Sequence, residues 1–120
     1  MLKNRIIPTM LMKNMGLVKD VGFKSQRRVG SLLPQIKIYN MREVDEIIIL
    51  DIGATLSKSV IDFKEIAEIA KFNFVPLTVG GGIKNLNQIE KLLSIGADKI
   101  SLNTIMYYDP NFIKEAVYNF

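Results

Sequence analysis

The sequence predicts an α/β protein built from four βα units, which is half of a (β/α)8 barrel. Four apolar runs alternate with four helical patterns along the 120 residues, and most of the connections are short. The runs are nearly continuous in Ile, Val and Leu, which is typical of parallel strands buried on both faces. A complete barrel needs eight such units in about 250 residues. We therefore expect residues 1–120 to form one domain, the N-terminal half of a barrel, incomplete at the C-terminus.

The expected strands are the four apolar runs, RIIPTM (5–10), EIIILD (46–51), FVPLTV (74–79) and KISLN (99–103). The expected helices lie between and after them, over 31–42, 59–72, 85–96 and 109–120.

The first two helices differ in the strength of their signals. The first has apolar residues at helical spacing, and Pro34 is compatible only with its first turn. The second begins with a capping box formed by Ser59 and Asp62. The apolar face expected for the second helix consists of Phe63, Ile66, Ala67 and Ala70.

The third and fourth helices carry clear start and stop residues. Asn85 is the expected N-cap of the third helix, and Gly96 is its expected stop. Asp109 is the expected N-cap of the fourth, with Pro110 as the first helical residue.

The connection over 13–30, between the first strand and its helix, is longer than the others. It contains two short alternating pieces, LVKDV and GFK, which suggest a flap-like hairpin. Loops of this length in compact domains are more often functional than not. We expect an active-site lid here, with a disordered insertion as the alternative.

The composition excludes several kinds of chemistry. The chain has no Cys and no His, so disulfides, thiolate nucleophiles, Cys/His zinc sites and Ser-His-Asp triads are excluded. General acid–base work falls to Asp, Glu, Lys or Tyr. The net charge is +4, but basic residues are interleaved with acids and only Arg27 and Arg28 are adjacent. We expect a small phosphorylated ligand, no nucleic acid, no metal and no cofactor.

The N-terminal stretch MLKNRIIPTMLM begins like a signal peptide and then departs from one. Pro8 interrupts it, Lys13 ends it early, and no small-residue cleavage site follows. No apolar run reaches the length of a membrane span. We therefore expect a cytoplasmic protein without a membrane partner.

Half a barrel would leave two bare strand edges, which proteins normally cover. Either two copies of the chain associate, or a C-terminal half-barrel completes it. We favour the second alternative.

The strongest local signal is TVGGGIKN (78–85), where a buried strand runs into three glycines before a capped helix. The backbone N–H groups of Gly80, Gly81 and Gly82 are candidates for binding a phosphate. The alternative is a tight turn that needs positive φ, for which one glycine would suffice. The next strand ends in Ser101, Asn103 and Thr104, whose polar groups would face the same pocket.

Charged residues mark both ends of the expected strands. Asp51 closes the second strand as a candidate base or hydroxyl ligand, or as a turn-forming residue. Arg5, Glu46 and Lys99 directly precede three strands, so in a barrel they would meet at the opposite opening. They suggest an ion-pair layer, with ordinary surface charge as the alternative.

Five motifs together resemble the cyclase subunit of imidazole glycerol phosphate synthase across almost the whole chain. They are RIIP, LVK (17–19), VDEIIILDI, PLTVGGGI and GADKISLNT. The resemblance implies a (β/α)8 barrel that receives ammonia from a separate glutaminase subunit. It also implies conversion of an aminated ribulosyl nucleotide with two phosphates into imidazole glycerol phosphate and aminoimidazole carboxamide ribotide.

The resemblance also assigns roles to particular residues. Gly82, Asn103 and Thr104 would hold one substrate phosphate. Lys19 and Asp51 would belong to the catalytic site, Lys19 by organising its closed form and Asp51 by lining the pocket. The ammonia gate and the contact that docks the glutaminase would be formed by Arg5, Glu46, Lys99 and Asp98.

Leu11 stands where the resembling family has a catalytic aspartate on its first strand. A leucine cannot transfer a proton, so three interpretations stay open. The chain is a cyclase in which another group replaces the acid, or an inactive half-barrel. The third is suggested by LMKNMGLVK (11–19), which is similar to LLKNGGLVK of a subgroup associated with amidination of N-acetyl sugars for surface polysaccharide. In that interpretation the chain conducts ammonia.

Overall fold

The computed structural model of this chain describes residues 3–13, 16–21, 25–30, 32–53 and 61–120. The described strands are β1 (Thr9–Lys13), β2 (Gly16–Val21), β3 (Ser25–Gly30), β4 (Ile47–Asp51), β5 (Leu77–Gly80) and β6 (Lys99–Ser101). The described helices are α1 (Leu32–Met41), α3 (Phe63–Phe72), α4 (Leu86–Ser94), α5 (Ile105–Tyr108) and α6 (Phe112–Asn119).

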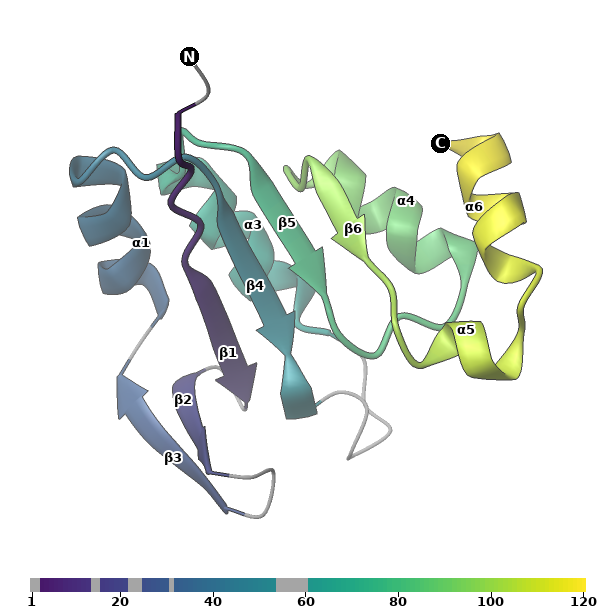
Figure 1. The fold of residues 1–120 in the computed structure, drawn as a ribbon, viewed down its shortest axis with the longest axis horizontal. Coiled ribbons are helices and arrows are strands. Elements are labelled where there is room, and N and C mark those ends of the chain that lie inside the picture. Colours follow the sequence, from purple (N-terminus) through teal and green to yellow (C-terminus); the bar gives the residue numbers. More distant parts are fainter. Residues whose placement is uncertain (1–2, 14–15, 22–24, 31, 54–60) are drawn as a thin grey trace.

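The strands form one sheet in the order β3-β2-β1-β4-β5-β6. The four strands β1, β4, β5 and β6 are parallel, and helices alternate with them along the chain, which confirms the predicted α/β fold of four βα units (Figure 1). A hairpin is present in the connection where we expected one, but its second strand is β3 and not GFK (22–24), which lies outside the described residues. β2 and β3 pair antiparallel, and β2 extends the sheet beyond β1.

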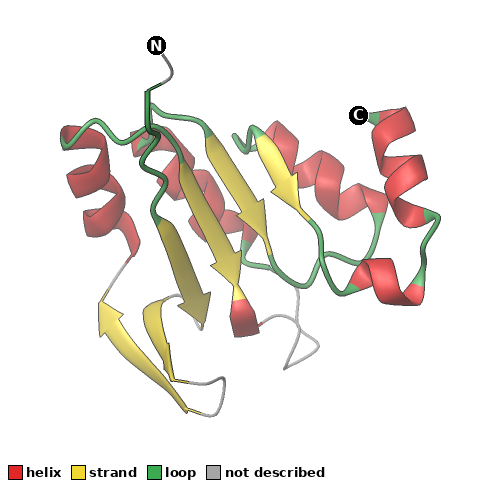
Figure 2. Ribbon diagram, in the orientation of Figure 1, coloured by secondary structure: helices red, strands yellow, loops and turns green. Residues whose placement is uncertain are grey.

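The helices α1, α3 and α4 lie on one face of the sheet, and Figure 2 shows no described helix on the other. Burial alternates accordingly: Ile47 and Ile49 of β4 are buried among the helices, whereas Ile48 and Leu50 are half-buried. Our expectation that both faces of the strands are buried is therefore wrong for this chain. Helices on a single face are the arrangement of a barrel and not of a doubly wound sheet. The uncovered face is the one that lines the interior of a closed barrel.

Four strand boundaries differ from the prediction by two residues or more, two of them because of proline. β1 starts at Thr9 and not at residue 5, because Pro8 has no N–H for the ladder and contributes only its carbonyl, to Ile48 N at 2.9 Å. β5 starts after Pro76 for the same reason. β6 ends at Ser101, two residues earlier than predicted. β1 also ends later than predicted, at Lys13 and not at residue 10, so Leu11 lies within the strand.

The first helix begins close to its predicted position, whereas the second begins later than predicted. α1 spans 32–41, as expected. α3 begins only at Phe63, because Asp62 is its N-cap and accepts a hydrogen bond from Glu65 N at 3.1 Å. The predicted capping residue Ser59 lies outside the described residues.

The prediction holds for α4 and fails for the start of the last helix. Asn85 caps α4 by accepting from Gln88 N at 2.9 Å, and Gly96 follows its end with a φ of 128°. Asp109 is not the N-cap of the last helix: it ends the additional helix α5, and α6 begins at Phe112. None of the described helices has the length and apolar character needed to cross a membrane.

Candidate functional site

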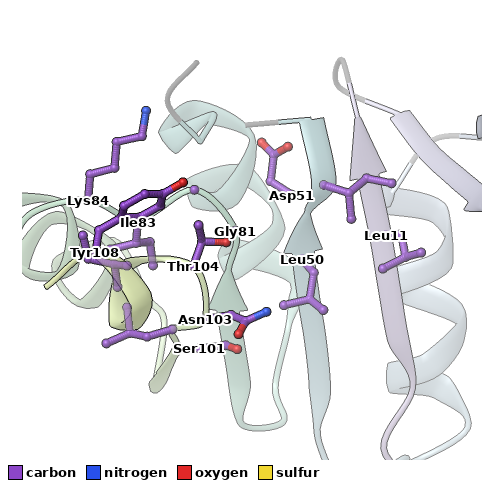
Figure 3. Close-up of a pocket in the computed structure, with 14 residues that line it drawn as sticks. Leu11, Leu50, Asp51, Gly81, Ile83, Lys84, Ser101, Asn103, Thr104 and Tyr108 are labelled. Atoms are coloured by element: carbon purple, nitrogen blue, oxygen red, sulfur yellow. The ribbon is translucent and has the colours of Figure 1, made fainter. Parts of the chain in front are cut away.

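A pocket of about 840 Å³ opens at the carboxyl ends of β4, β5 and β6. Its lining includes most of the residues that the sequence predicted for this end of the sheet, and Figure 3 shows labelled side chains from β1, β4 and β6 and from the loops that follow β5 and β6. These are Leu11, Asp51, Gly81, Gly82, Ser101, Asn103 and Thr104. The carboxyl ends of parallel strands are where α/β proteins place their ligands, so this is the candidate active site.

Each of the three glycines has a structural reason of its own. A Cβ on Gly80 would lie 2.7 Å from both Cβ and the carbonyl oxygen of Ser101 on the neighbouring strand. Gly81 and Gly82 have φ values of 110° and 65°, which disfavour residues with side chains. The prediction that one glycine would suffice for the turn is therefore wrong. Packing at Gly80 and positive φ at Gly81 and Gly82 explain the glycine run, so the argument for an anion site depends on the polar groups around it.

Those polar groups come from the loop after β6. Ser101 is half-buried at the end of the strand, and Asn103 and Thr104 are exposed at the pocket. Thr104 precedes α5 without forming a side-chain cap, so capping does not account for its hydroxyl. One amide and two hydroxyl groups therefore border the pocket opposite the glycine turn.

Lys84 and Tyr108 also line the pocket, and our sequence analysis missed both (Figure 3). Lys84 adds a positive charge directly after the glycine turn. Its backbone N–H donates to Gln88 Oε1 at 2.7 Å, which ties this residue to the first turn of α4. The sequence could have indicated Lys84 as a pocket residue, because it is a basic residue between the glycines and the N-cap Asn85. Tyr108 had no such signal, because α5 was not predicted.

Asp51 is buried, with 8% of its surface exposed, at the last position of β4. Its Oδ1 accepts a hydrogen bond from Gly53 N at 3.0 Å, which is the turn-forming contact that we considered as the alternative to a chemical role. The residue lines the pocket as well, so the contact does not remove it as a candidate for chemistry.

Leu11 lies opposite Leu50 in the β1–β4 pairing, and both line the pocket. The wall on the β1 side is thus apolar where the resembling family has an acid. Lys19 lies in β2, paired with Arg27 of β3, which places its backbone in the hairpin next to β1. The side chain of Lys19 is outside the described part of the structure.

The predicted ion-pair layer is present at the opposite end of the sheet. Glu46 is buried, and its two carboxylate oxygens bind Arg5 at 2.6 Å and Lys99 at 2.5 Å. The hydrogen bond from Lys99, together with the charges of Arg5 and Lys99, lowers the pKa of Glu46 against the opposing effect of burial. Both cations remain more than half exposed, so the cluster faces solvent on its cationic side.

Asp98 has a structural contact at this same end. Its Oδ2 accepts a hydrogen bond from Leu77 N at 2.8 Å and so joins the starts of β5 and β6. Asp45 makes the equivalent contact two βα units earlier, between the starts of β1 and β4, by accepting from Ile6 N at 2.6 Å. We did not predict either bond, although the repeated sequence of Asp, charged residue and Ile in VDEI and ADKI was a signal for them.

Comparison with known proteins identifies the family. The family model described as histidine biosynthesis protein matches residues 5–120. A Campylobacter jejuni protein with a provisional name as an imidazole glycerol phosphate synthase subunit is 53% identical over 116 residues, which is 97% of this chain and 46% of that protein. The imidazole glycerol phosphate synthase subunit HisF of Staphylococcus saprophyticus is 42% identical over 116 residues, again 97% and 46%.

A third relative gives the same picture. A Pseudomonas aeruginosa protein, also provisionally named as a subunit of this synthase, is 43% identical over 114 residues, 95% of this chain and 45% of that protein. The chain thus spans about half the length of the curated relatives it matches.

Proposed function

The chain belongs to the histidine biosynthesis protein family, and on that premise we propose that it supplies the N-terminal half of an imidazole glycerol phosphate synthase cyclase. In this role it binds a phosphorylated substrate in the pocket and receives ammonia from a glutaminase subunit at the opposite end of the sheet. A C-terminal half-barrel completes the domain at the free edge of β6.

The observation that carries the substrate proposal is the convergence of polar groups on the glycine turn. Ser101, Asn103 and Thr104 border the same pocket as Gly81 and Gly82. Hydroxyl, amide and backbone N–H groups donate hydrogen bonds to phosphate oxygens, and Lys84 supplies a positive charge beside them. A phosphate ester matches this set of donors better than a neutral ligand does.

The charged cluster supports the ammonia proposal. Glu46, Arg5 and Lys99 lie at the amino ends of the strands, at the far end of the sheet from the pocket. Ammonia that enters at this end reaches the pocket through the interior of a closed barrel, without passing through bulk water. The cluster then acts as the entrance through which ammonia passes.

The apolar wall at Leu11 favours a second candidate function. A cyclase that follows the family scheme needs a proton-transferring group here, and leucine has none. An ammonia-conducting partner in amidination of N-acetyl sugars needs the barrel and the entrance but not this acid. In both candidates the chain works with a glutaminase.

Ammonium-dependent turnover separates the two candidates. The chain is joined to the C-terminal half of the Staphylococcus saprophyticus relative and assayed in three forms: unsubstituted, Leu11→Asp and Leu11→Asn. The asparagine variant matches aspartate in size and polarity but cannot transfer a proton. General acid–base catalysis contributes about 10²–10⁴-fold, so the ammonia-conducting candidate predicts appreciable turnover only for Leu11→Asp. The cyclase candidate predicts turnover of the unsubstituted protein as well.

Each outcome selects one interpretation. If turnover requires Leu11→Asp, the barrel lacks only the acid of its first strand, and its natural role is ammonia delivery. Equal turnover of the unsubstituted protein overturns that role and makes the chain a cyclase with an altered acid. If no form turns over, binds the glutaminase or binds a phosphate ester, the chain is an inactive half-barrel and both candidates fail.

A further inference from the structure

The short helix α5 ends in two neighbouring tyrosines that are equally exposed. Tyr107 is 81% exposed and Tyr108 is 82% exposed, and no residue of α5 is fully buried. Tyr108 lines the pocket at the carboxyl ends of the strands, whereas Tyr107 is not among the residues that line it. The two side chains therefore differ in their position relative to the pocket and not in their exposure.

The spacing of residues along α5 explains why Tyr108 reaches the pocket. Residues three or four positions apart lie on the same face of a helix. Tyr108 follows Thr104 by four positions and Ile105 by three, and both of these residues line the pocket. Thr104 already has helical dihedral angles, with a φ of −57° and a ψ of −39°. Tyr107 follows Ile105 by only two positions, a spacing that places it on a different side of the helix.

The backbone at Tyr108 is held from both sides. Ile105 packs against the hydrophobic core, and its carbonyl oxygen accepts from Asp109 N at 2.8 Å. The carbonyl oxygen of Asp109 in turn accepts from the backbone N–H of the buried Phe112 at 3.0 Å. Only the two side-chain torsions of Tyr108 remain to be fixed when a ligand binds, so ordering this residue costs little conformational entropy.

The charges of the pocket lie on opposite sides. Figure 3 shows the Tyr108 ring on the side where Lys84 and Thr104 lie, with its hydroxyl oxygen directed into the pocket, whereas Asp51 comes from the other side. A phosphate group carries nearly two negative charges at neutral pH. Attraction to Lys84 and repulsion from the carboxylate of Asp51 therefore favour a phosphate on the side of Tyr108.

We propose that the phenol hydroxyl of Tyr108 donates a hydrogen bond to the phosphate group of the ligand that binds at the glycine turn. This inference rests on the proposed function, which places a phosphorylated substrate in the pocket. A phosphate group has three terminal oxygens that accept hydrogen bonds strongly, so the donors at Thr104 and Lys84 leave acceptor positions for a further hydroxyl. The phosphate is then held by the glycine turn, by Lys84 and by α5.

The test is titration calorimetry of glycerol phosphate into the full chain, in three forms: unsubstituted, Tyr108→Phe and Tyr107→Phe. Each substitution removes one oxygen atom from an exposed side chain of α5 and leaves the ring and the net charge unchanged. Tyr107→Phe is therefore the matched control. Titration at two salt concentrations checks that no charge has changed, because the salt dependence of binding should then be the same in all three proteins. Thermal unfolding of each variant checks the fold.

The expected result is binding roughly tenfold weaker for Tyr108→Phe, the loss that corresponds to one hydrogen bond to a charged group, with Tyr107→Phe unchanged. Equal binding of Tyr108→Phe and the unsubstituted chain overturns the inference and leaves the proposed substrate class intact. Equal losses in both variants also overturn it, because the effect then belongs to α5 as a whole.

Two further outcomes count against the inference. If affinity falls in Tyr108→Phe together with the midpoint of thermal unfolding, the hydroxyl supports the fold of α5 and not the ligand. If the unsubstituted chain does not bind glycerol phosphate, the phosphorylated substrate of the proposed function fails, and the role of Tyr108 fails with it.

Discussion

A Cβ atom added to Gly81 would clash with the carbonyl oxygen of Asp51, so the glycine turn after β5 and the end of β4 touch through their backbones. This contact brings together two of the strand ends that border the pocket. It also means that the shape of the pocket depends on a position where no side chain fits.

Gly81→Ala is expected to destabilise the fold more than Gly82→Ala. At Gly82 the φ of 65° is left-handed helical, which costs a residue with a side chain about 1–2 kcal/mol. At Gly81 the φ of 110° is less accessible, and the clash with Asp51 adds to the strain. Urea unfolding of both variants measures the difference in the free energy of unfolding. Equal losses would mean that the backbone contact relaxes freely.

Glu46→Gln is expected to make stability less sensitive to acid. Because Lys99 and Arg5 lower the pKa of Glu46, the ionised carboxylate stabilises the folded state. That stability is fully present above the ordinary glutamate value of 4.5 and is lost as pH falls through the lowered folded value. The midpoint of thermal unfolding should therefore fall less steeply below pH 4.5 in the variant.

The matched control for this prediction is Glu68→Gln. Glu68 forms an exposed pair with Lys71 at 3.2 Å, and exposed pairs contribute little to stability. The midpoint of thermal unfolding of Glu68→Gln should therefore depend on pH in the same way as that of the unsubstituted chain. Parallel profiles for all three proteins would contradict a stabilising role of the buried carboxylate.

Asp98→Ala is expected to cost about 1–3 kcal/mol of stability, because Leu77 N loses its carboxylate acceptor at the start of β5. Asp98→Asn keeps an acceptor oxygen at the same place and should cost less. Chemical denaturation measures both. The asparagine variant also distinguishes a structural role of Asp98 from a role in docking. If Asp98→Asn keeps its stability but binds the glutaminase more weakly, the negative charge of Asp98 contributes to the partner contact. If binding is unchanged, Asp98 acts only in the contact between the strands.

Lys84→Ala is expected to weaken binding of a phosphate ester roughly fivefold, which corresponds to about 1 kcal/mol for an exposed charge. Lys84 lines the pocket next to the glycine turn, so its charge acts directly on an anion bound there. Titration with glycerol phosphate at low salt measures the change. Lys91→Ala is the control, because Lys91 lies 4.3 Å from the centre of the Phe63 ring. A loss of the same size in the control would indicate a nonspecific effect of net charge.

Short-range sequence signals predicted the ends of a helix correctly where the capping contact involves only neighbouring residues. Asn85 and Gly96 delimit α4 as expected, because an N-cap and a left-handed stop need only neighbouring residues. The failures have local causes as well. Pro8 delays β1 because the ring nitrogen cannot donate, and Asp109 ends one helix instead of starting another, since α5 intervenes.

The sequence by itself determined the fold class, the two strand ends of the pocket and the charges of the Glu46 cluster. These follow from hydrophobic periodicity and from the rule that parallel strands align their ends. Only the tertiary structure decided that Gly80 and Gly81 leave no room for a side chain, that Asp98 holds β5, and that Phe74 is left exposed at the amino ends of the strands. Each of these depends on contacts between residues far apart in the chain, such as Asn40 with Phe74 and Asp51 with Gly81. No local sequence pattern indicates such contacts, because they form only when separate βα units pack together.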